Sequence, residues 1–409
     1  MTTNDRRFIE PYKPTEKSFW KITIALALAS FAVFSILYSV HPLLPLFVKK
    51  FHVSPTTSSL LLSSSVVSMV IGLLLLGFLS DRYGRVKVMI IGLVGSLVCL
   101  LSMTVIDHFI GLLVLRFIQG FFLAGLPAAA IAYISEEIDD ASVGQSVSIY
   151  IASNALGGMA GRVVVGYLAD TFDWKVAFII LSGFCGCMTV LFILLIEKSR
   201  HFVHSKRAII DDLKGMLFHL TNMELIPLFL TGFILQTVFM GLWTYLPFYL
   251  VGEPYYLSLK EISFIYFAYG FGVISSPIAG RLSSQYGLVR MLVLGIYIMV
   301  FAIFLTLIQA TSWIVIGFCL ICFGFFIAHS MAAAIVSQTA KHHKGSASSF
   351  YLVSYYVGVA TGGTATGFLW TQLSWYGVTG LVLLLFPIIL FYIRKVKIFN
   401  REVPENIKQ

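Results

Sequence analysis

The sequence predicts an all-α membrane protein with twelve transmembrane helices, arranged as two pseudo-symmetric six-helix bundles. Three observations predict this fold: an apolar composition, twelve apolar runs of spanning length, and an internal repeat that relates the two halves. Of the 409 residues, 58% are hydrophobic and only 11% are charged. A soluble domain carries about a quarter charged residues, so the chain falls in the polytopic membrane class.

The predicted spans are largely apolar runs of about 20 residues, the length that crosses a bilayer. They cover residues 21–46, 58–79, 88–106, 110–134, 146–169, 175–196, 223–250, 261–279, 290–309, 313–336, 347–370 and 376–393. The first run is too long for a cleaved signal core, so we expect it in the mature fold. The longest and most charged gap divides the spans six and six. The predicted parts are therefore a tail at 1–20, an N-terminal bundle at 21–196, a central loop at 197–222, a C-terminal bundle at 223–393 and a tail at 394–409.

The distribution of Lys and Arg predicts that both termini and the central loop are cytoplasmic. An even number of spans places both ends on one side of the membrane. If that side is the cytoplasm, its loops and tails hold 22 basic residues, against four on the opposite side. This asymmetry follows the positive-inside rule. The net charge of +9 is therefore explained by orientation, and we expect no nucleic-acid partner.

An internal repeat relates the two halves at an offset of about 202 residues. The segment GFLSDRYGRVKV from Gly77 returns as GRLSSQYGLVRM from Gly280, without the first copy's Asp and second Arg. A weaker echo, GYLAD at Gly166 and GFLWT at Gly367, relates three-helix units of inverted topology. Such repeats place a solute site near the midplane, between the halves.

Two segments of the sequence resemble signatures of the major facilitator superfamily, and the likeness covers about residues 20 to 395. GFLSDRYGRVK resembles the signature between helices 2 and 3, and RFIQG from Arg116 resembles the superfamily's Arg motif. NALGGMAGR from Asn154 is similar to the bacterial drug and sugar efflux subgroup, the YnfM-like drug:H⁺ antiporter type with 12 helices. The chain departs from many antiporters in lacking a motif proline in the fifth span and an acid in the first.

The resemblance implies a conformational latch at Gly77, Asp81, Gly84 and Arg85. The two glycines allow a tight turn. In the family arrangement the Asp81 carboxylate lies against the N-terminus of the eleventh span, where the helix dipole stabilises a negative charge by roughly 0.3–1 kcal/mol. Arg85 holds Asp81 in place, and protonation of Asp81 loosens the latch. The alternative is an ordinary solvated loop charge.

Four ionisable residues and one amide are candidates for proton or substrate coupling: Arg116, Gln119, Arg162, His41 and His329. A charge inside a span is costly unless it is paired or faces water. For Arg116 the alternative is snorkelling to the outer headgroups, and for Arg162 it is a structural pair with Asp170 or Asp173. For each histidine the alternative is a neutral, hydrogen-bonded packing role.

Aromatic and amide side chains in the first, fifth, seventh, eighth and eleventh spans are candidates to line a solute cavity. They are Tyr38, Asn154, Gln236, Trp243, Tyr245, Tyr266, Tyr269 and Tyr355. Such a lining suits an amphiphilic, aromatic or sugar-like solute. The alternative is an interfacial aromatic belt.

The resulting hypothesis is a secondary active transporter in the bacterial cytoplasmic membrane that exports a small molecule by proton antiport. The alternatives are proton-coupled uptake of a small, anionic metabolite, or a lipid or glycolipid translocase on the same fold. The sequence contains no nucleotide-binding loop, zinc spacing or nucleophile elbow, so we expect neither an enzyme nor a cofactor or metal. The expected partners are the solute, protons and the bilayer, and we expect a functional monomer.

Overall fold

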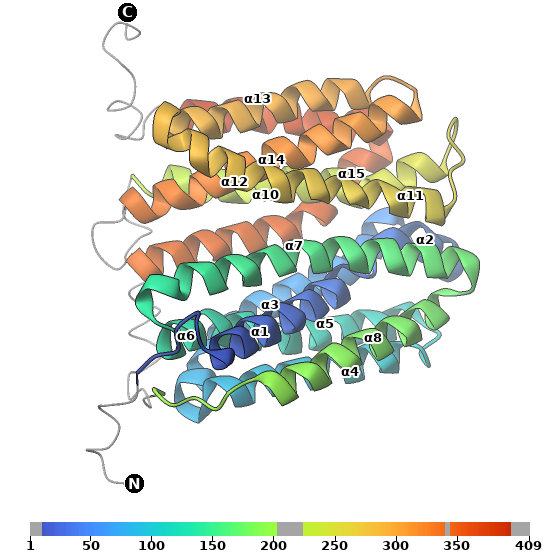
Figure 1. The fold of residues 1–409 in the computed structure, drawn as a ribbon. Helices are drawn as coiled ribbons and strands as arrows, with labels where there is room; N and C mark the ends of the chain where they lie inside the picture. The colour runs from blue at the N-terminus through green and yellow to red at the C-terminus, as the bar shows by residue number, and fades with distance from the viewer. Residues whose placement is uncertain (1–9, 203–223, 340–343, 394–409) are drawn as a thin grey trace, which may run out of the picture. The chain divides into compact units, whose positions relative to one another are not determined.

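The computed structural model describes residues 10–202, 224–339 and 344–393. Most of the predicted central loop, the first nine residues and the predicted C-terminal tail lie outside these ranges. Within them every named element is a helix, and one isolated parallel bridge joins Tyr12 to Ile138. The predicted all-α class is therefore confirmed (Figure 1).

The described helices include ten that are long and apolar enough to cross a membrane, where the sequence predicts twelve spans. The predicted span 146–169 lies in α7 (Asp140–Thr171), a helix rich in glycine and polar side chains that is not among the ten. The last two predicted spans lie in α15 (Lys344–Ile393), which is continuous except at Ser374, where φ is 50° and ψ is −137°.

The chain packs into two units. The first contains residues up to Leu43 and those from Ser64 to the end of the described range at 202. The second contains Leu44–Ser63 and the described residues from 224 onward. The second unit thus takes in one segment of the predicted N-terminal bundle, and α3 (Pro55–Tyr83) belongs to both units.

In the first unit, α1 (Lys17–Tyr38) packs on α7 and on α8 (Trp174–Leu195) (Figure 1). The helix α4 (Arg85–Met103) packs on α5 (Phe109–Leu123), α6 (Pro127–Glu137) and α8. The faces turned away from these contacts carry exposed apolar side chains such as Ile91, Val98 and Ile179, as expected for surfaces that meet lipid.

In the second unit, α10 (Ile226–Val251) packs along α15, and α13 (Leu288–Thr306) along α14 (Thr311–Thr339). The remaining helices of this unit are shorter or interrupted. They are α2 (Leu44–Phe51), α11 (Leu259–Ile265) with the 3₁₀ turn η4 (Tyr266–Ala268), and α12 (Tyr269–Tyr286).

Glycines at matching positions of the repeat bring equivalent helices together in each unit. A Cβ atom on Gly157 or Gly161 of α7 would collide with the backbone of α1 at Phe31 or Ser35. Small residues at such crossings allow helix backbones to approach closely in a membrane.

Two helices of the second unit also approach each other closely at glycine residues. A Cβ atom on Gly358 or Gly362 of α15 would collide with the backbone of α10 at Phe233 or Thr237. The pair α1–α7 therefore corresponds to the pair α10–α15, which supports the repeat predicted from the sequence.

Three predicted spans are interrupted where the sequence analysis expected continuous helices. The predicted span 261–279 runs from α11 through the turn η4 into α12. The other two breaks each lie at a proline. The first span stops at Tyr38, continues as the 3₁₀ turn η2 (His41–Leu43) and resumes as α2. The fourth span breaks between Leu123 and Pro127. Proline has no N–H and clashes with the preceding turn, so Pro42 and Pro127 explain the two breaks.

The α1–α7 crossing leads to a first prediction. We expect Gly161→Ala to destabilise the protein by about 1–3 kcal/mol, because the added methyl group overpacks the contact with Ser35. Gly183→Ala on α8 is the matched control, since its Cβ would enter open space and should stabilise the helix by about 1 kcal/mol. Thermal unfolding of the detergent-purified protein measures both, and equal shifts would contradict the close approach.

Candidate functional site

The break in the first span exposes backbone carbonyl groups, and Arg116 binds them. The last four carbonyls of a helix have no partner within the helix. The Nη2 of Arg116 donates to the Leu37 carbonyl at 2.7 Å, and its Nη1 donates to the Ile36 carbonyl at 3.4 Å. The guanidinium also meets the negative end of the α1 dipole. Arg116 on α5 thus caps α1.

Burial of Arg116 bears on one of its two predicted roles, snorkelling to the headgroups. The residue is 0% exposed, which excludes snorkelling to the headgroups. Its Nη1 also donates to Gln119 Oε1 at 2.6 Å, and Gln119 Nε2 donates to the Ser96 carbonyl at 3.0 Å. One chain of hydrogen bonds therefore joins α1, α5 and α4.

Arg162 contacts the same break from α7. Its Nε donates to His41 Nδ1 at 3.1 Å, and its Nη1 donates to the Gly158 carbonyl at 2.7 Å. The guanidinium lies 3.9 Å from the centroid of the Tyr38 ring, and that ring stacks on His41. The structure therefore brings together three residues that the sequence analysis placed in different groups: Arg162, His41 and Tyr38.

The acidic residues proposed as structural partners of Arg162 lie near the end of α7. Asp173 caps α8 by accepting the N–H of Lys175 at 2.8 Å. Asp170 lies eight residues from Arg162, which is about 12 Å along a helix. The contacts of Arg162 described above are with an imidazole, a carbonyl and an aromatic ring, so the predicted pair with an acidic residue stays a prediction.

His329 belongs to a separate aromatic group in the second unit. Its Nδ1 lies 2.9 Å from the Tyr351 hydroxyl, and its ring lies 4.6 Å from that of Tyr355 and stacks on Phe325. His329 and Tyr355 are half-buried.

The other predicted cavity-lining side chains of the second unit pack inside it. Trp243 is fully buried and lies 4.9 Å from the ring of Tyr266 and 4.8 Å from that of Tyr269. Tyr245 is also buried, and its hydroxyl donates to the Gly363 carbonyl at 2.8 Å. Burial excludes an interfacial belt for these four aromatic residues.

Two amides complete the predicted lining. Asn154 on α7 is half-buried, and its Oδ1 accepts a hydrogen bond from Ser30 on α1. Gln236 on α10 is 1% exposed, and its Oε1 has no hydrogen-bond partner among the described residues.

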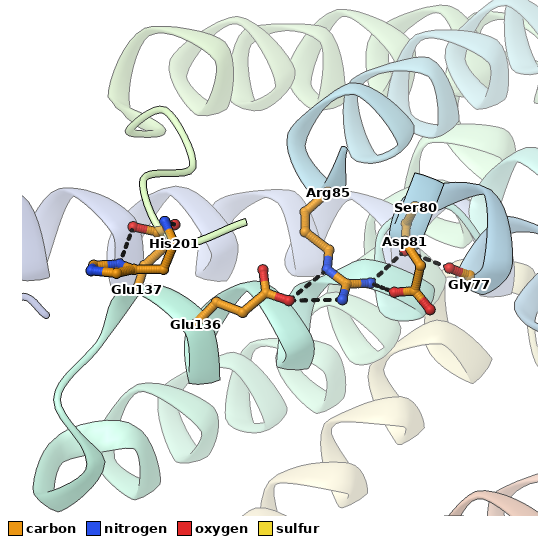
Figure 2. A network of polar contacts seen from close by, with 7 residues as sticks. All are labelled: Gly77, Ser80, Asp81, Arg85, Glu136, Glu137 and His201. Atoms are coloured by element: carbon orange, nitrogen blue, oxygen red, sulfur yellow. Dashed lines mark hydrogen bonds and ion pairs between the residues drawn. The ribbon is translucent and has the colours of Figure 1, made fainter. Parts of the chain in front are cut away.

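Figure 2 shows the residues around the predicted latch. Arg85 pairs with Asp81, as the sequence analysis expected, and its Nη1 donates to Ser80 Oγ at 2.9 Å. The Nε and Nη2 of Arg85 also donate to Glu136 Oε1, at 3.1 and 2.7 Å. One arginine therefore serves two carboxylates, from α3 and α6.

Both copies of the repeated turn need glycine. Gly84 has a φ of 106° and Gly287 a φ of 86°, a region that disfavours residues with a Cβ. In the first copy Ser80 Oγ donates to the Gly77 carbonyl at 2.7 Å. In the second, the equivalent Ser283 Oγ donates to the Gly280 carbonyl at 2.8 Å, and Ser284, at the position of Asp81, donates to the Arg281 carbonyl of its own helix.

A second carboxylate next to Glu136 holds the segment that follows α8. Glu137 is 0% exposed, and its Oε1 accepts the N–H groups of Arg200 and His201 at 2.7 and 3.0 Å. Its Oε2 lies 3.3 Å from His201 Nδ1 (Figure 2). The backbone of Tyr12 also pairs with the end of α6. The Tyr12 carbonyl accepts the N–H of Asp139, and the Tyr12 N–H donates to the Glu137 carbonyl.

Tyr12 and Arg200 complete this arrangement. The Arg200 guanidinium lies 3.7 Å from the Tyr12 ring centroid. Burial raises the pKa of the Tyr12 phenol, an effect that the Arg200 charge partly offsets. The sequence analysis missed Glu136, Glu137 and these partners, although the acidic run SEEIDD was the available signal.

The capping role of Arg116 leads to a second prediction. Arg116→Gln should lower stability by about 1.5–3 kcal/mol, the range for hydrogen bonds to a charged group. Arg116→Lys should cost less, because an ammonium keeps the charge but loses the planar fork. Thermal unfolding tests both, with the exposed Lys87→Gln as control. A Gln variant as stable as this control would refute the capping.

A third prediction concerns Glu136. We expect Glu136→Ala to raise amide hydrogen exchange in the turn at residues 84–88 by about tenfold, or about 1.4 kcal/mol, because Arg85 loses its Glu136 contact. The exposed Asp140→Ala, four residues away, should leave that exchange unchanged. Equal exchange in the two variants would show that Asp81 alone holds Arg85.

Known proteins that are similar to this chain over most of its length are membrane transporters. The family model of the Major Facilitator Superfamily matches residues 26–272 and 228–408. The MFS-type transporter YybF of Bacillus subtilis is 37% identical over 364 residues, which cover 89% of this chain and 90% of YybF. The inner membrane transport protein YnfM of Escherichia coli is 35% identical over 372 residues, covering 91% and 89%.

More distant likenesses extend over the same length. The multi-drug resistance efflux pump PmrA of Streptococcus pneumoniae is 24% identical over 371 residues, covering 88% of this chain and 92% of PmrA. The inward-facing, unoccupied crystal structure of a bacterial homologue of the human lysosomal transporter Spinster has a TM-score of 0.78 at 12% identity, covering 96% and 99%. With its repeated glycine turns, its buried arginines and these matches over most of its length, the chain belongs to the major facilitator superfamily.

Proposed function

We propose that this protein is a proton-coupled secondary active transporter that exports a small molecule across the bacterial cytoplasmic membrane by alternating access. The observation that carries the proposal is the pair of arginines, Arg116 and Arg162, buried among apolar helices at the break of the first span. Ionisable groups inside spans mark solute and proton pathways. The similarity to PmrA, an efflux pump, supports export.

The membrane topology that accompanies this proposal has twelve spans and cytoplasmic termini. Counting α7 and the two arms of α15 as separate spans adds two to the ten apolar helices of the described chain. The excess of Lys and Arg in the loops and tails on one side supports the orientation. A monomer contains both repeats that alternating access requires.

In this proposal, the cluster of Asp81, Arg85 and Glu136 is the cytoplasmic latch. Glu136 keeps Arg85 anchored within the first unit, and the Asp81 carboxylate carries the charge that responds to protons. The second copy of the turn has Ser284 in place of Asp81, so only the first copy has a carboxylate at this position.

A second candidate function is the uptake of a small anion together with a proton. The specific observation that favours it is that both buried arginines contact the segment 36–41, which lies in a stretch of sequence, residues 17–80, without Asp or Glu. Direction of transport separates the two candidates.

The proposed function leads to a fourth prediction. In proteoliposomes with an imposed pH gradient, the wild type should move solute, and Asp81→Asn should change the rate severalfold because it removes the titratable latch. Ser284→Ala should leave the rate close to that of the wild type. If no gradient moves any solute of a broad panel, proton-coupled transport fails. If the two variants behave alike, the one-sided latch fails.

A further inference from the structure

We infer that Arg162 and His41, with Tyr38 as a platform, form a binding site for an oxyanion such as a carboxylate, sulfonate or phosphate ester, and that this anion binds together with one proton on His41. The inference rests on the second candidate of the proposed function, uptake of a small anion together with a proton, and names a substrate class for it.

The first step is the charge of the site. The helices α1, α4, α5 and α8 contain no Asp or Glu, and α7 contains only Asp140 and Asp170, at its two ends. Arg116 and Arg162 are nevertheless both buried and both contact the segment 36–41. A buried cation is costly unless an opposite charge accompanies it. These helices therefore bring two cations to the break, and the acidic residues that they carry lie only at the ends of α7.

The second step is the protonation state of His41. A guanidinium has only donors, so the Nε–H of Arg162 needs a free lone pair on His41 Nδ1. The imidazole is therefore neutral and carries its proton on Nε2. A protonated imidazole has an N–H on both nitrogens and cannot accept this hydrogen bond. The Arg162–His41 bond and a proton on Nδ1 exclude each other.

The third step is the effect of a proton. Protonation of His41 breaks the bond, frees the Nε–H of Arg162 and places two cations side by side. The charged groups that face His41 are Arg162 from α7 and Arg116 from α5, both positive, while α1 contributes the Tyr38 ring. An oxyanion bound between Arg162 and His41 accepts from both cations and offsets their repulsion. Anion and proton therefore stabilise each other, and the linkage is reciprocal.

The fourth step is the geometry of recognition. The Arg162 guanidinium is a planar fork that matches the two oxygens of a carboxylate or the oxygens of a phosphate. Its plane is oriented by the Tyr38 ring at 3.9 Å and by the Gly158 carbonyl at 2.7 Å. A Cβ on Gly158 would lie 3.1 Å from Tyr38 Cδ2 and 3.3 Å from Arg162 Nη1, so glycine leaves room for this stack.

The position of the site in the chain suits a coupling role. His41 opens the turn η2, whose residues connect α1 to α2, and the chain passes from the first unit to the second two residues later. Replacement of the Arg162–His41 hydrogen bond by contacts with an anion therefore changes the contacts of a residue in the short segment that connects the two units.

The test measures ligand binding by the full-length protein in detergent. Binding is detected as a rise in the thermal unfolding temperature. Benzoate and benzenesulfonate are the probes, because both stay ionised between about pH 5.5 and about pH 7.5, the range in which a histidine titrates. Benzamide is the neutral counterpart. We expect at least one of the anions to bind, with an affinity at least about fivefold higher at the lower pH, and benzamide to have no effect.

Two variants separate the site from general effects. His41→Gln offers an oxygen that accepts from Arg162 but takes no proton, so it should fold normally and bind the anion with no pH dependence. Arg162→Gln should lose anion binding at both pH values. His108→Gln, an exposed histidine of the same unit, should behave like the wild type.

Three results would overturn the inference: no stabilisation by either anion, equal affinity at the two pH values in the wild type, or unchanged pH dependence in His41→Gln. These outcomes are distinct from failure of the proposed function. Proton-driven movement of neutral or cationic solutes in liposomes would leave transport standing without the anion site, and binding is measurable even if no transport is found.

Discussion

The structure of the first unit depends on which groups donate hydrogen bonds to the free carbonyls at the end of α1, away from water. The first span breaks after Tyr38, and the carbonyls of the last turn of α1 point toward α5. No water is available in a hydrocarbon layer, so a protein group has to donate to them. Arg116 provides several donors in one plane and a full charge at the negative end of the helix dipole. Ser39 adds a hydroxyl that donates to the Ile36 carbonyl at 2.8 Å. Together these donors stabilise the break, and the free carbonyls explain why a charge is buried in an apolar bundle.

The same break gathers the other polar residues of the unit. Tyr38 is the last residue of α1 and His41 opens the turn η2 that follows, and Arg162 reaches both from α7. The glycines of α7 allow α1 to approach closely enough for these contacts. Backbone geometry, close helix packing and buried charge are therefore parts of one arrangement, and none of the three is independent of the others.

A second polar group lies where α3 meets α4 and where α6 ends, and it joins segments rather than building a cavity. Glu136 draws the α3–α4 turn to α6 through Arg85, and its neighbour Glu137 holds the backbone that follows α8. Adjacent residues on one helix end thus fasten the turn that carries the proposed latch and the start of the chain that leads to the second unit.

The sequence by itself determined the helical class, most of the span positions, the repeat and the Asp81–Arg85 pair, because these depend on local hydropathy and on residues a few positions apart. It also marked Arg116, Arg162 and His41 as unusual. Their partners were decided only by the tertiary structure. His41 and Arg162 are 121 residues apart, and Glu136 lies 51 residues from Arg85. The partners of Arg116 are backbone carbonyls, which every residue has and which become available only where a helix ends. Packing determines which distant segments meet, and proline determines where the helix stops. The presence of an arginine in the sequence therefore predicts neither which distant segment it contacts nor where free carbonyls are available to it.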